Sequence, residues 1–422
     1  MKCNADTSLR GRAIRLAVPA SVIPMGSGSV MVTAGNFGPD VRSDCRVSLD
    51  IQDSGGLDII IRSKVGTMYG ESIRGLVCEV LSLFDIEHAH VELDDSGALP
   101  FTLAARLETA VRRARSEETR EFLPGMLPAN KAASPRQRFR RSRLYLPGNS
   151  PKFMINAGLH KPDGIILDLE DSVAPSEKDA ARILVRNALC QVDFCGSERM
   201  VRINQVPLGL EDLKYIVPHN VHLILIPKCE NPEQVRAVDA EIARIFRECG
   251  RSEPVYLMPI LESAAGILSA REIAAASPNN VALTIGLEDY TADIGVERTP
   301  EGRESFFARC MIVNAARAAG LQPIDTVFSD VADDAGLMAS ILEAKSLGFE
   351  GKGCIHPRQI RTVHKGFAPS PSELEKAGRI VAAYEDAQAR GSSVTVVGSK
   401  MIDPPVVKRA LRVIHLAQAD KQ

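Results

Sequence analysis

The sequence predicts an α/β protein in which a (β/α)8 TIM barrel follows a small α+β domain. Eight short runs rich in Val, Ile and Leu lie between positions 142 and 357, and helical patterns separate them. Runs without strict alternation of apolar and polar residues are typical of strands buried on both faces of a parallel sheet. Eight such strands alternating with helices predict a closed barrel, with its chemistry at the carboxyl ends of the strands.

Each predicted element follows from its local pattern. The predicted barrel strands are Ser142–Gly148, Gly164–Asp171, Met200–Asn204, Leu223–Lys228, Tyr256–Glu262, Val281–Asp289, Asp325–Phe328 and Gly353–Pro357. Apolar residues at three- and four-residue spacing predict the intervening helices Ser176–Leu189, Asn231–Cys249, Glu301–Ala319 and Ala332–Leu347. A further helix is predicted over Ser370–Arg390, beyond the eighth strand, followed by a tail that contains the segment MIDPP.

The chain is long for one domain, and its pattern divides it into three parts. Residues 1–115 contain four strand-like runs with partial alternation, at Val30–Thr33, Val47–Ile51, Leu57–Ile61 and Ala89–Leu93. Amphipathic helices are expected over Tyr69–Phe84 and Leu99–Ala114. Residues 116–138 are rich in proline and charge, which indicates a linker or a loosely attached strap. Residues 139–422 form the barrel and its carboxyl-terminal extension.

Composition excludes several classes of function. A formal net charge of −2 does not favour nucleic acid or an anionic membrane as a partner. No apolar stretch reaches the roughly 18 residues of a membrane span. Without an apolar signal segment, a cytoplasmic location is expected, and the nine scattered cysteines are expected to be thiols.

The ends of the predicted barrel strands are largely anionic. They carry Asp168, Glu170, Asp171, Arg202, Lys228, Glu262, Glu288, Asp289 and His356. Glu262 and Asp289 end neighbouring strands, which lie about 5 Å apart in a sheet, so the two carboxylates are expected to share one Mg²⁺. An ion with only two protein ligands keeps positions open for a 2-oxo or 2-hydroxy carboxylate substrate. Asp168, Glu170 and Asp171 are expected to hold its waters.

The basic residues at this edge have two interpretations each. In one interpretation, Arg202 binds a carboxylate or thioester oxygen of the substrate in a forked geometry. In the other, it pairs with the carboxylates after the second strand. Lys228 supports the same anion site or neutralises Glu262. His356 belongs to the site or is structural.

The motifs from Arg140 onward resemble the citrate lyase beta-subunit family, the HpcH/HpaI-type aldolases that include malyl-CoA lyases. They include RRSRLYLPGN, DGIILDLEDSV, VRIN, IPKCE, ILESAAGI, IGLEDY and GFEGKGCIHPRQI. The resemblance implies a Mg²⁺-dependent barrel, with Glu262 and Asp289 as metal ligands and Glu262, Arg202 and Arg141 in contact with substrate. It also implies that Asp403, in MIDPP, is an acid/base that reaches the site of a neighbouring subunit in a homo-oligomer.

The amino-terminal unit is similar to the citrate lyase gamma subunit, an acyl carrier protein, and more weakly to the carrier subunit of malonate decarboxylase. The similar segments are IPMGSGSVMV, SKVGTMYGESIRGLVCEVL and HVELDDSGALPFTLAARLETAV. The resemblance implies that Ser27 carries a phosphoribosyl-dephospho-CoA prosthetic group. Ser29 stands where the family usually has Asp, and it is a second candidate for the attachment.

Together the two resemblances imply cleavage of a citryl thioester, carried in cis, to oxaloacetate and an acetyl thioester. Asp403 or Asp171, the latter through water, would exchange the proton with the acetyl carbon. A citrate lyase alpha-like transferase subunit would load the acyl thioester substrate. Two alternatives are a malyl-CoA or citramalyl-CoA lyase with a vestigial carrier domain, and a non-enzymatic assembly or regulatory component of a lyase complex.

Overall fold

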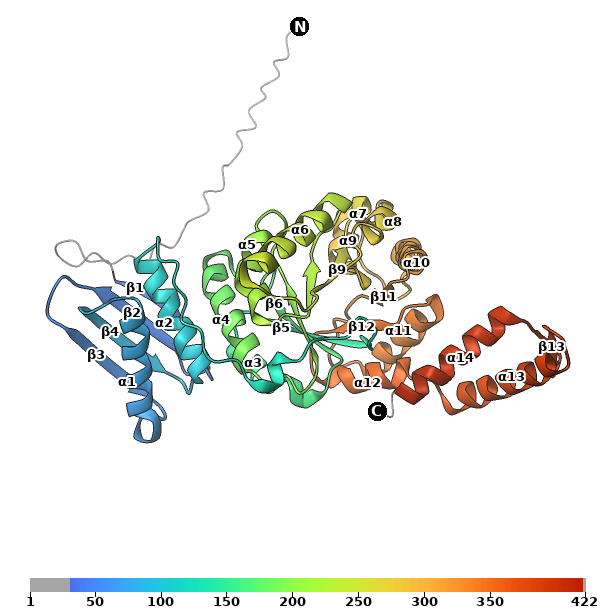
Figure 1. Ribbon diagram of the computed structural model, residues 1–422, viewed down its shortest axis with the longest axis horizontal. Helices are drawn as coiled ribbons and strands as arrows, with labels where there is room; N and C mark the ends of the chain where they lie inside the picture. The colour runs from blue at the N-terminus through green and yellow to red at the C-terminus, as the bar shows by residue number, and fades with distance from the viewer. Residues whose placement is uncertain (1–30, 420–422) are drawn as a thin grey trace, which may run out of the picture.

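The computed structural model describes residues 31–419, which form three bodies in a row (Figure 1). A small domain at the amino-terminal side contacts a central barrel, and a helical hairpin extends from the opposite side of the barrel. Ser27 and Ser29 lie outside the described residues. Among the described helices, none combines the length and the apolar character that crossing a membrane requires.

The small domain is a four-stranded sheet covered by two helices. Its strands are β1 (Val32–Gly35), β2 (Cys45–Ile51), β3 (Leu57–Ser63) and β4 (Ala89–Asp95), in the order β1-β2-β4-β3. Only β3 and β4 pair in parallel. Cys45, Val47 and Leu49 of β2 are buried against α1 (Gly66–Leu83) and α2 (Pro100–Ala114), while Arg46 between them is exposed. This alternation confirms the predicted α+β sandwich.

The barrel is closed by eight parallel strands, as predicted. They are β5 (Ser142–Pro147), β6 (Gly164–Asp168), β7 (Glu198–Arg202), β8 (Leu223–Ile226), β9 (Tyr256–Leu261), β10 (Ala282–Ile285), β11 (Gln322–Asp325) and β12 (Gly351–Cys354). The helices that surround them are α3 (Pro151–Met154), α4 (Lys178–Gln191), α5 (Gly209–Ile216), α6 (Pro232–Cys249), α7 (Ala264–Leu268), α8 (Ala270–Ala274), α9 (Leu287–Asp293), α10 (Arg303–Ala318), α11 (Asp334–Leu347) and α12 (Arg358–Phe367). Short 3-10 helices lie at Pro128–Lys131, Ala157–His160, Pro175–Glu177 and Val217–His219.

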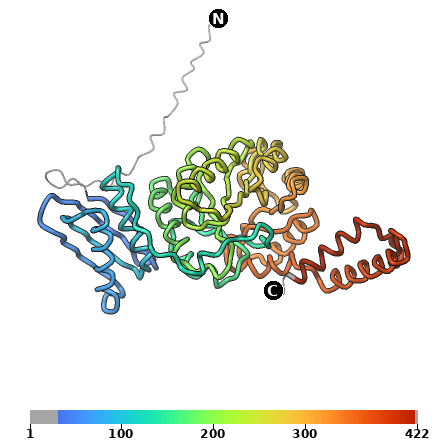
Figure 2. Tube along the Cα trace, viewed as in Figure 1, coloured from blue at the N-terminus to red at the C-terminus, as the bar shows by residue number. Residues whose placement is uncertain are grey.

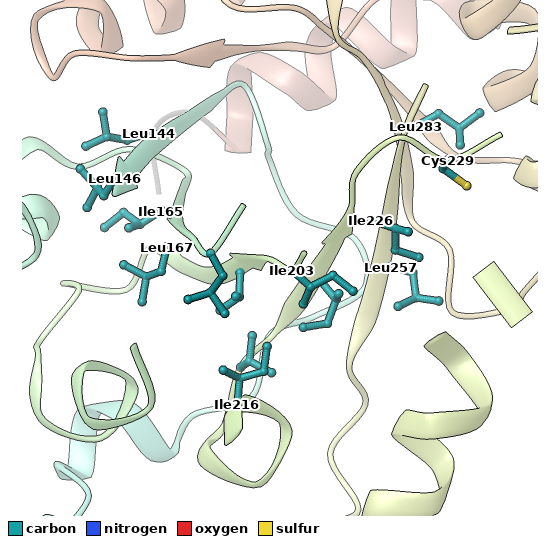
Figure 3. Packing of buried hydrophobic residues seen from close by; sticks show 14 of the residues in the cluster. Leu144, Leu146, Ile165, Leu167, Ile203, Ile216, Ile226, Cys229, Leu257 and Leu283 are labelled. Carbon is teal, nitrogen blue, oxygen red and sulfur yellow. The ribbon is translucent and has the colours of Figure 1, made fainter. Parts of the chain in front are cut away.

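The main core lies between the strands and the surrounding helices. Figure 3 shows part of it, with Leu144 and Leu146 of β5 beside Ile165 and Leu167 of β6. These side chains point outward from the barrel, so the alternate residues of each strand point into its interior. In β5 the inward positions are Arg143 and Tyr145, which therefore reach the barrel axis from a strand whose outer face is aliphatic.

The last two predicted barrel strands are displaced along the chain. β11 shares only Asp325 with the predicted run Asp325–Phe328, and β12 ends three residues before Pro357. Pro323 interrupts the apolar pattern of the real strand. Phe328, by contrast, packs against the barrel core from the loop that follows β11. The sequence pattern therefore predicted a strand where Phe328 lies in a loop, because this apolar residue is packed against the core in the way a strand residue is.

The segment from residue 116 to residue 138 is firmly bound to the barrel, which corrects the expectation of a loosely attached strap. The buried amide of Asn130 donates hydrogen bonds to the carbonyl oxygens of Leu189, Cys190 and Val192, at 2.9, 3.2 and 2.8 Å. Its carbonyl accepts from Arg199 at 2.8 Å. The segment has only one short 3-10 helix, at Pro128–Lys131, but its polar contacts bind it to the barrel.

The carboxyl-terminal extension is a helical hairpin (Figure 2). Helix α13 (Pro371–Ala389) begins at Ser370, whose hydroxyl accepts from the Glu373 amide in a capping box, as expected for the predicted additional helix. A small hairpin of β13 (Thr395–Val397) and β14 (Lys400–Ile402) leads to α14 (Pro404–Ala419). Arg412 of α14 pairs with Glu350, which ties the returning helix to the barrel.

Candidate functional site

A cavity of about 340 Å³ opens at the carboxyl ends of the barrel strands. Its wall contains Asp168, Arg202, Glu262, Glu288 and Asp289, so the structure brings together five of the residues predicted at the strand ends. They come from different strand ends or from the segments that follow them. This convergence is the consequence of barrel closure, because the residues are separated by up to 121 positions in the chain.

Asp168 and Arg202 form a forked ion pair at the ends of β6 and β7. Arg202 donates from Nε to Oδ1 of Asp168 at 2.6 Å and from Nη2 to Oδ2 at 2.8 Å. Burial disfavours the charged form of both side chains. Their contact with each other has the larger effect, so the pKa of Asp168 is lowered and the pKa of Arg202 is raised. The guanidinium also lies over the ring of Tyr145, 5.5 Å from its centroid. The two hydrogen bonds therefore fix the Arg202 guanidinium at the cavity wall.

The loop after β6 adds two further carboxylates. Glu170 is 2.9 Å from Nη1 of Arg202 and 3.3 Å from Nζ of Lys228. Burial and the neighbouring Asp171 carboxylate raise the pKa of Glu170. Asp171 is half exposed and lies 3.8 Å from Arg202 and 3.7 Å from Lys228. Asp171 thus contacts the same cations as Glu170 from the solvent side.

Lys228 connects these carboxylates with the next two strands. Its ammonium is 3.7 Å from Asp289, and its main-chain amide donates to Oε1 of Glu262 at 2.7 Å. Burial acts to lower the pKa of Lys228, but the surrounding carboxylates of Glu170, Asp171 and Asp289 raise it overall. Within residues 31–419 the ammonium pairs with Glu170, Asp171 and Asp289 and forms no ion pair with Glu262, so the structure does not support the alternative in which Lys228 neutralises Glu262.

Glu262 is almost completely buried at the end of β9. Burial, together with the nearby carboxylates of Asp289 and Glu170, raises its pKa to about 8. A Cβ atom at Gly286 would lie 2.3 Å from Oε2 of Glu262, so only glycine at this position leaves space for the carboxylate. The protonated form of the Glu262 carboxyl is therefore favoured in this environment, and a bound cation would favour the ionised form instead.

Asp289 lies in the first turn of α9, four residues beyond the end of β10, which corrects the predicted extent of that strand. Its side chain is 43% exposed at the cavity rim. One buried and one exposed carboxylate form a donor set that suits Mg²⁺, which retains several waters in proteins. No three His, Cys, Asp or Glu side chains within residues 31–419 are grouped closely enough to hold a metal.

The structure contradicts the expectation that Arg141 lies at the mouth. Arg141 precedes β5 and is therefore at the amino end of the parallel barrel, opposite the cavity. Its guanidinium donates from Nε to Asp163 at 2.9 Å and lies 4.6 Å from the Phe139 ring centroid. The inward-facing arginine of this segment is Arg143, two residues later. Arg143 lies within the apolar run SRLYLP, whereas Arg141 precedes it, so the position at which the strand begins is the signal that distinguishes them.

Three other candidates lie away from the cavity or outside the described residues. Asp403 follows β14, and its carboxylate accepts from the Val406 amide at 3.2 Å at the start of α14, in the carboxyl-terminal extension. His356 accepts from the Arg358 amide at 3.1 Å, which supports its structural interpretation. Ser27 precedes the described residues.

A closed (β/α)8 barrel with a buried carboxylate, an exposed one and a fixed arginine at its mouth is the arrangement of a barrel enzyme whose chemistry lies at the carboxyl ends of the strands. Residues 141–357 match the family model described as HpcH/HpaI aldolase/citrate lyase, and the chain belongs to this family. Its members among the relatives below are lyases, and the chain is an enzyme of this class. Residues 31–114 match a carrier-protein model described as malonate decarboxylase delta subunit.

Similar proteins cover the barrel and its extension. The citrate lyase subunit beta of Haemophilus influenzae is 40% identical over 67% of this chain and 98% of its own length. The L-malyl-CoA/beta-methylmalyl-CoA lyase of Cereibacter sphaeroides is 34% identical over 67% of this chain and 96% of its own. The crystal structure of CitE from Mycobacterium tuberculosis, in complex with magnesium, acetoacetate and coenzyme A, has a TM-score of 0.55 at 30% identity; it covers 66% of this chain and 98% of that protein.

Proposed function

We propose that the barrel cleaves a citryl thioester to oxaloacetate and an acetyl thioester, with the thioester carried by the amino-terminal domain of the same chain. The observation that carries the proposal is the meeting of Glu262, Asp289 and Arg202 in one cavity. The 40% identity to a citrate lyase beta subunit favours citryl over other acyl groups.

Glu262 and Asp289 would hold Mg²⁺, as the magnesium bound by the CitE relative suggests. When bound, the ion supplies a Lewis acid that lowers the pKa of a coordinated hydroxyl group. The amide of Lys228 orients Glu262 by its hydrogen bond to Oε1. Asp168 orients Arg202 through two hydrogen bonds, so that the guanidinium meets the thioester in a fixed position.

The reaction is a retro-Claisen cleavage. Transfer of the hydroxyl proton to water gives an alkoxide, which collapses to the carbonyl of oxaloacetate as the carbon–carbon bond breaks. The electron pair of that bond moves into the thioester, whose enolate oxygen is stabilised by Arg202. Protonation of the enolate carbon by Asp403, or by Asp171 through water, gives the acetyl thioester. Asp403 would come from a neighbouring copy in a homo-oligomer, since its own extension projects away from the barrel (Figure 1).

Delivery in cis is supported by the contact of the small domain with the mouth loop. Arg113, in the last turn of α2, donates to the Thr33 carbonyl at 2.6 Å and to Asp179 at 2.7 Å. Asp179 follows the loop that carries Glu170 and Asp171. Thr33 is six positions after Ser27, and six residues of chain span at most about 20 Å. A phosphoribosyl-dephospho-CoA arm on Ser27 would then raise the local concentration of the thioester at this mouth. A citrate lyase alpha-like transferase would load it.

The test combines mass and turnover. Intact-mass measurement should find the prosthetic group on Ser27, with Ser27→Ala and Ser29→Ala variants distinguishing the two candidate serines. Citryl, malyl and citramalyl thioesters are then assayed with Mg²⁺, on CoA and on the modified carrier. Preferential cleavage of the citryl carrier supports the proposal. Efficient cleavage of free malyl-CoA or citramalyl-CoA by unmodified protein would instead support the alternative with a vestigial carrier domain, which the 34% identity to a malyl-CoA lyase favours.

The remaining alternative, a non-enzymatic assembly component, predicts no turnover of any of these thioesters. Membership of a lyase family and the complete set of cavity carboxylates both oppose it.

A further inference from the structure

Arg143 is a buried cation inside the barrel that the proposed cleavage does not use. It lies on β5 with 1% of its surface exposed, and it lines the same cavity as Glu262 and Asp289. Burying a guanidinium is costly unless a negative charge and hydrogen bonds accompany it. The groups that contact Arg143 therefore indicate its function.

The partners of Arg143 within the protein are weak and neutral. Nη1 is 3.2 Å from the Met258 sulfur, and Nη2 is 3.4 Å from the Thr284 hydroxyl and 3.3 Å from the main-chain oxygen of Asp325. Nε is buried and has no hydrogen-bond partner. Within residues 31–419 no carboxylate forms an ion pair with Arg143, so its charge is left without a counter-ion.

The nearest carboxylate is already engaged by other cations. Asp325 points its side chain toward Arg309, at 3.0 Å, and toward the fully buried Lys352, at 2.9 Å. Arg143 reaches only the carbonyl oxygen of that residue. The other acidic wall of the cavity is likewise committed, because Asp168 is held in the fork of Arg202. Neither Asp325 nor Asp168 therefore forms an ion pair with Arg143.

An anionic ligand would supply the missing charge. Fork-shaped guanidinium groups bind carboxylates through two parallel hydrogen bonds, and Nε with an Nη nitrogen gives one such edge. The products of citryl cleavage include a 2-oxo acid with two carboxylates. One of these lies beside the reacting oxygen and chelates with it, which leaves the second for another part of the cavity. Malyl and citramalyl groups have only the first.

We propose that Arg143 is a specificity-determining residue that binds the second carboxylate of the hydroxyacyl group, and so selects thioesters whose acyl part carries two free carboxylates. This inference rests on the proposed lyase function, and it identifies the substrate class at the same site. Thr284 and the Asp325 carbonyl contact Nη2 of the guanidinium, while Nε has no hydrogen-bond partner within residues 31–419. The Mg²⁺ ligands position one end of the acyl group, and Arg143 positions the other.

Binding of stable 2-hydroxy acids tests the inference without turnover. Malate and lactate differ only in the second carboxylate, and each is titrated by calorimetry into the full chain with saturating Mg²⁺. We expect the wild type to prefer malate by about 10- to 100-fold, the effect of a hydrogen-bonded charge pair. Arg143→Met should abolish that preference, because malate should bind more weakly while the affinity for lactate should stay within about twofold of the wild-type value. Arg143→Gln, which keeps a polar contact without the charge, serves if Arg143→Met does not fold.

Kinetics provide the second measurement. For CoA thioesters, Arg143→Met should lower kcat/KM for citryl by about 10- to 100-fold and leave citramalyl almost unchanged. Equal losses on both substrates, or a wild type that binds lactate as tightly as malate, would overturn the inference. A wild type that cleaves neither thioester yet prefers malate through Arg143 would contradict the proposed function and leave the assignment of Arg143 standing.

Discussion

Arg186 of the barrel and Glu108 of the small domain form an ion pair in which both side chains are completely buried. Arg186 donates from Nη1 to Oε1 at 2.9 Å and from Nη2 to Oε2 at 2.5 Å. The pair lies between α2 and α4, where Asn187 also donates to the Phe101 carbonyl at 3.1 Å. Phe101 and Ala105 of α2 belong to the barrel core. The carrier-like domain is therefore attached by a packed and charge-matched interface.

Removing one member of this pair should destabilise the protein strongly. Glu108→Gln leaves Arg186 with only Glu121, and Arg186→Met leaves Glu108 with only Arg112, so each change breaks a buried ion-pair network. We expect a loss of at least about 2 kcal/mol in the free energy of unfolding. The double variant Glu108→Leu/Arg186→Met should lose less than the sum of the single changes. Urea denaturation measures both. Arg236→Met, which breaks an exposed pair with Glu233 on α6, is the control and should cost less than about 1 kcal/mol.

Loss of either proposed metal ligand should remove Mg²⁺-dependent activity. Glu262→Gln and Asp289→Asn each delete one negative ligand and should weaken Mg²⁺ binding by at least about 100-fold. Glu288→Gln is the matched control, since Glu288 neighbours Asp289 in α9 but pairs with Arg298 at 2.5 Å. Full activity of Glu262→Gln with Mg²⁺ present would refute the ligand assignment.

Gly286→Ala should act through Glu262 alone. The backbone at Gly286 has φ −105°, which alanine adopts without strain, but the added Cβ would lie 2.3 Å from Oε2 of Glu262. We expect the variant to fold and to bind Mg²⁺ at least about tenfold more weakly, because the carboxylate must move. Gly75→Ala in α1, where the Cβ meets nothing within 4 Å, should leave Mg²⁺ binding unchanged.

The affinity for Mg²⁺ should rise with pH up to about 8. Burial raises the pKa of Glu262 to about 8 in the metal-free protein, so at pH 7 the cation must displace a proton. The apparent affinity should therefore increase by about tenfold per pH unit below pH 8 and level off above it. Calorimetry in buffers of different ionisation enthalpy measures the released proton. In Glu262→Gln the pH slope should disappear.

The same raised pKa predicts the pH dependence of stability without metal. Glu262 favours folding most below its unfolded pKa near 4.5, and that contribution is lost as the pH rises through about 8. This loss of folding stability should be absent in the Glu262→Gln variant, and Mg²⁺ should reverse it in the wild type. Melting temperatures between pH 5 and pH 9, with and without the ion, measure both effects.

Asp403 should act between subunits. Asp403→Asn and Glu262→Gln are each expected to be inactive, but a mixed oligomer contains sites with an intact mouth from one copy and an intact extension from another. Random mixing in equal amounts should restore about one quarter of wild-type activity. Mixtures that stay inactive after subunit exchange, or a fully active Asp403→Asn variant, would rule out this role.

The sequence by itself determined the barrel, because the runs of Val, Ile and Leu in β6 and β8 are buried on both faces and have no other stable arrangement in a soluble α/β domain. It also indicated Glu262 and Arg202, since residues that directly follow a buried strand must reach the carboxyl edge of the sheet. It failed at Arg141 and Arg143, where a shift of two residues moves a side chain from the amino end of the barrel to its interior.

Only the tertiary structure decided which charges are neutralised. Arg202 and Arg143 are both cavity arginines, but Asp168 pairs with the first and no carboxylate within residues 31–419 pairs with the second. The raised pKa of Glu262 and the glycine that makes room for it likewise depend on neighbours from other strands. Local sequence patterns specify which residues are buried; they do not specify which buried charges meet, because that depends on how distant segments are brought together by barrel closure.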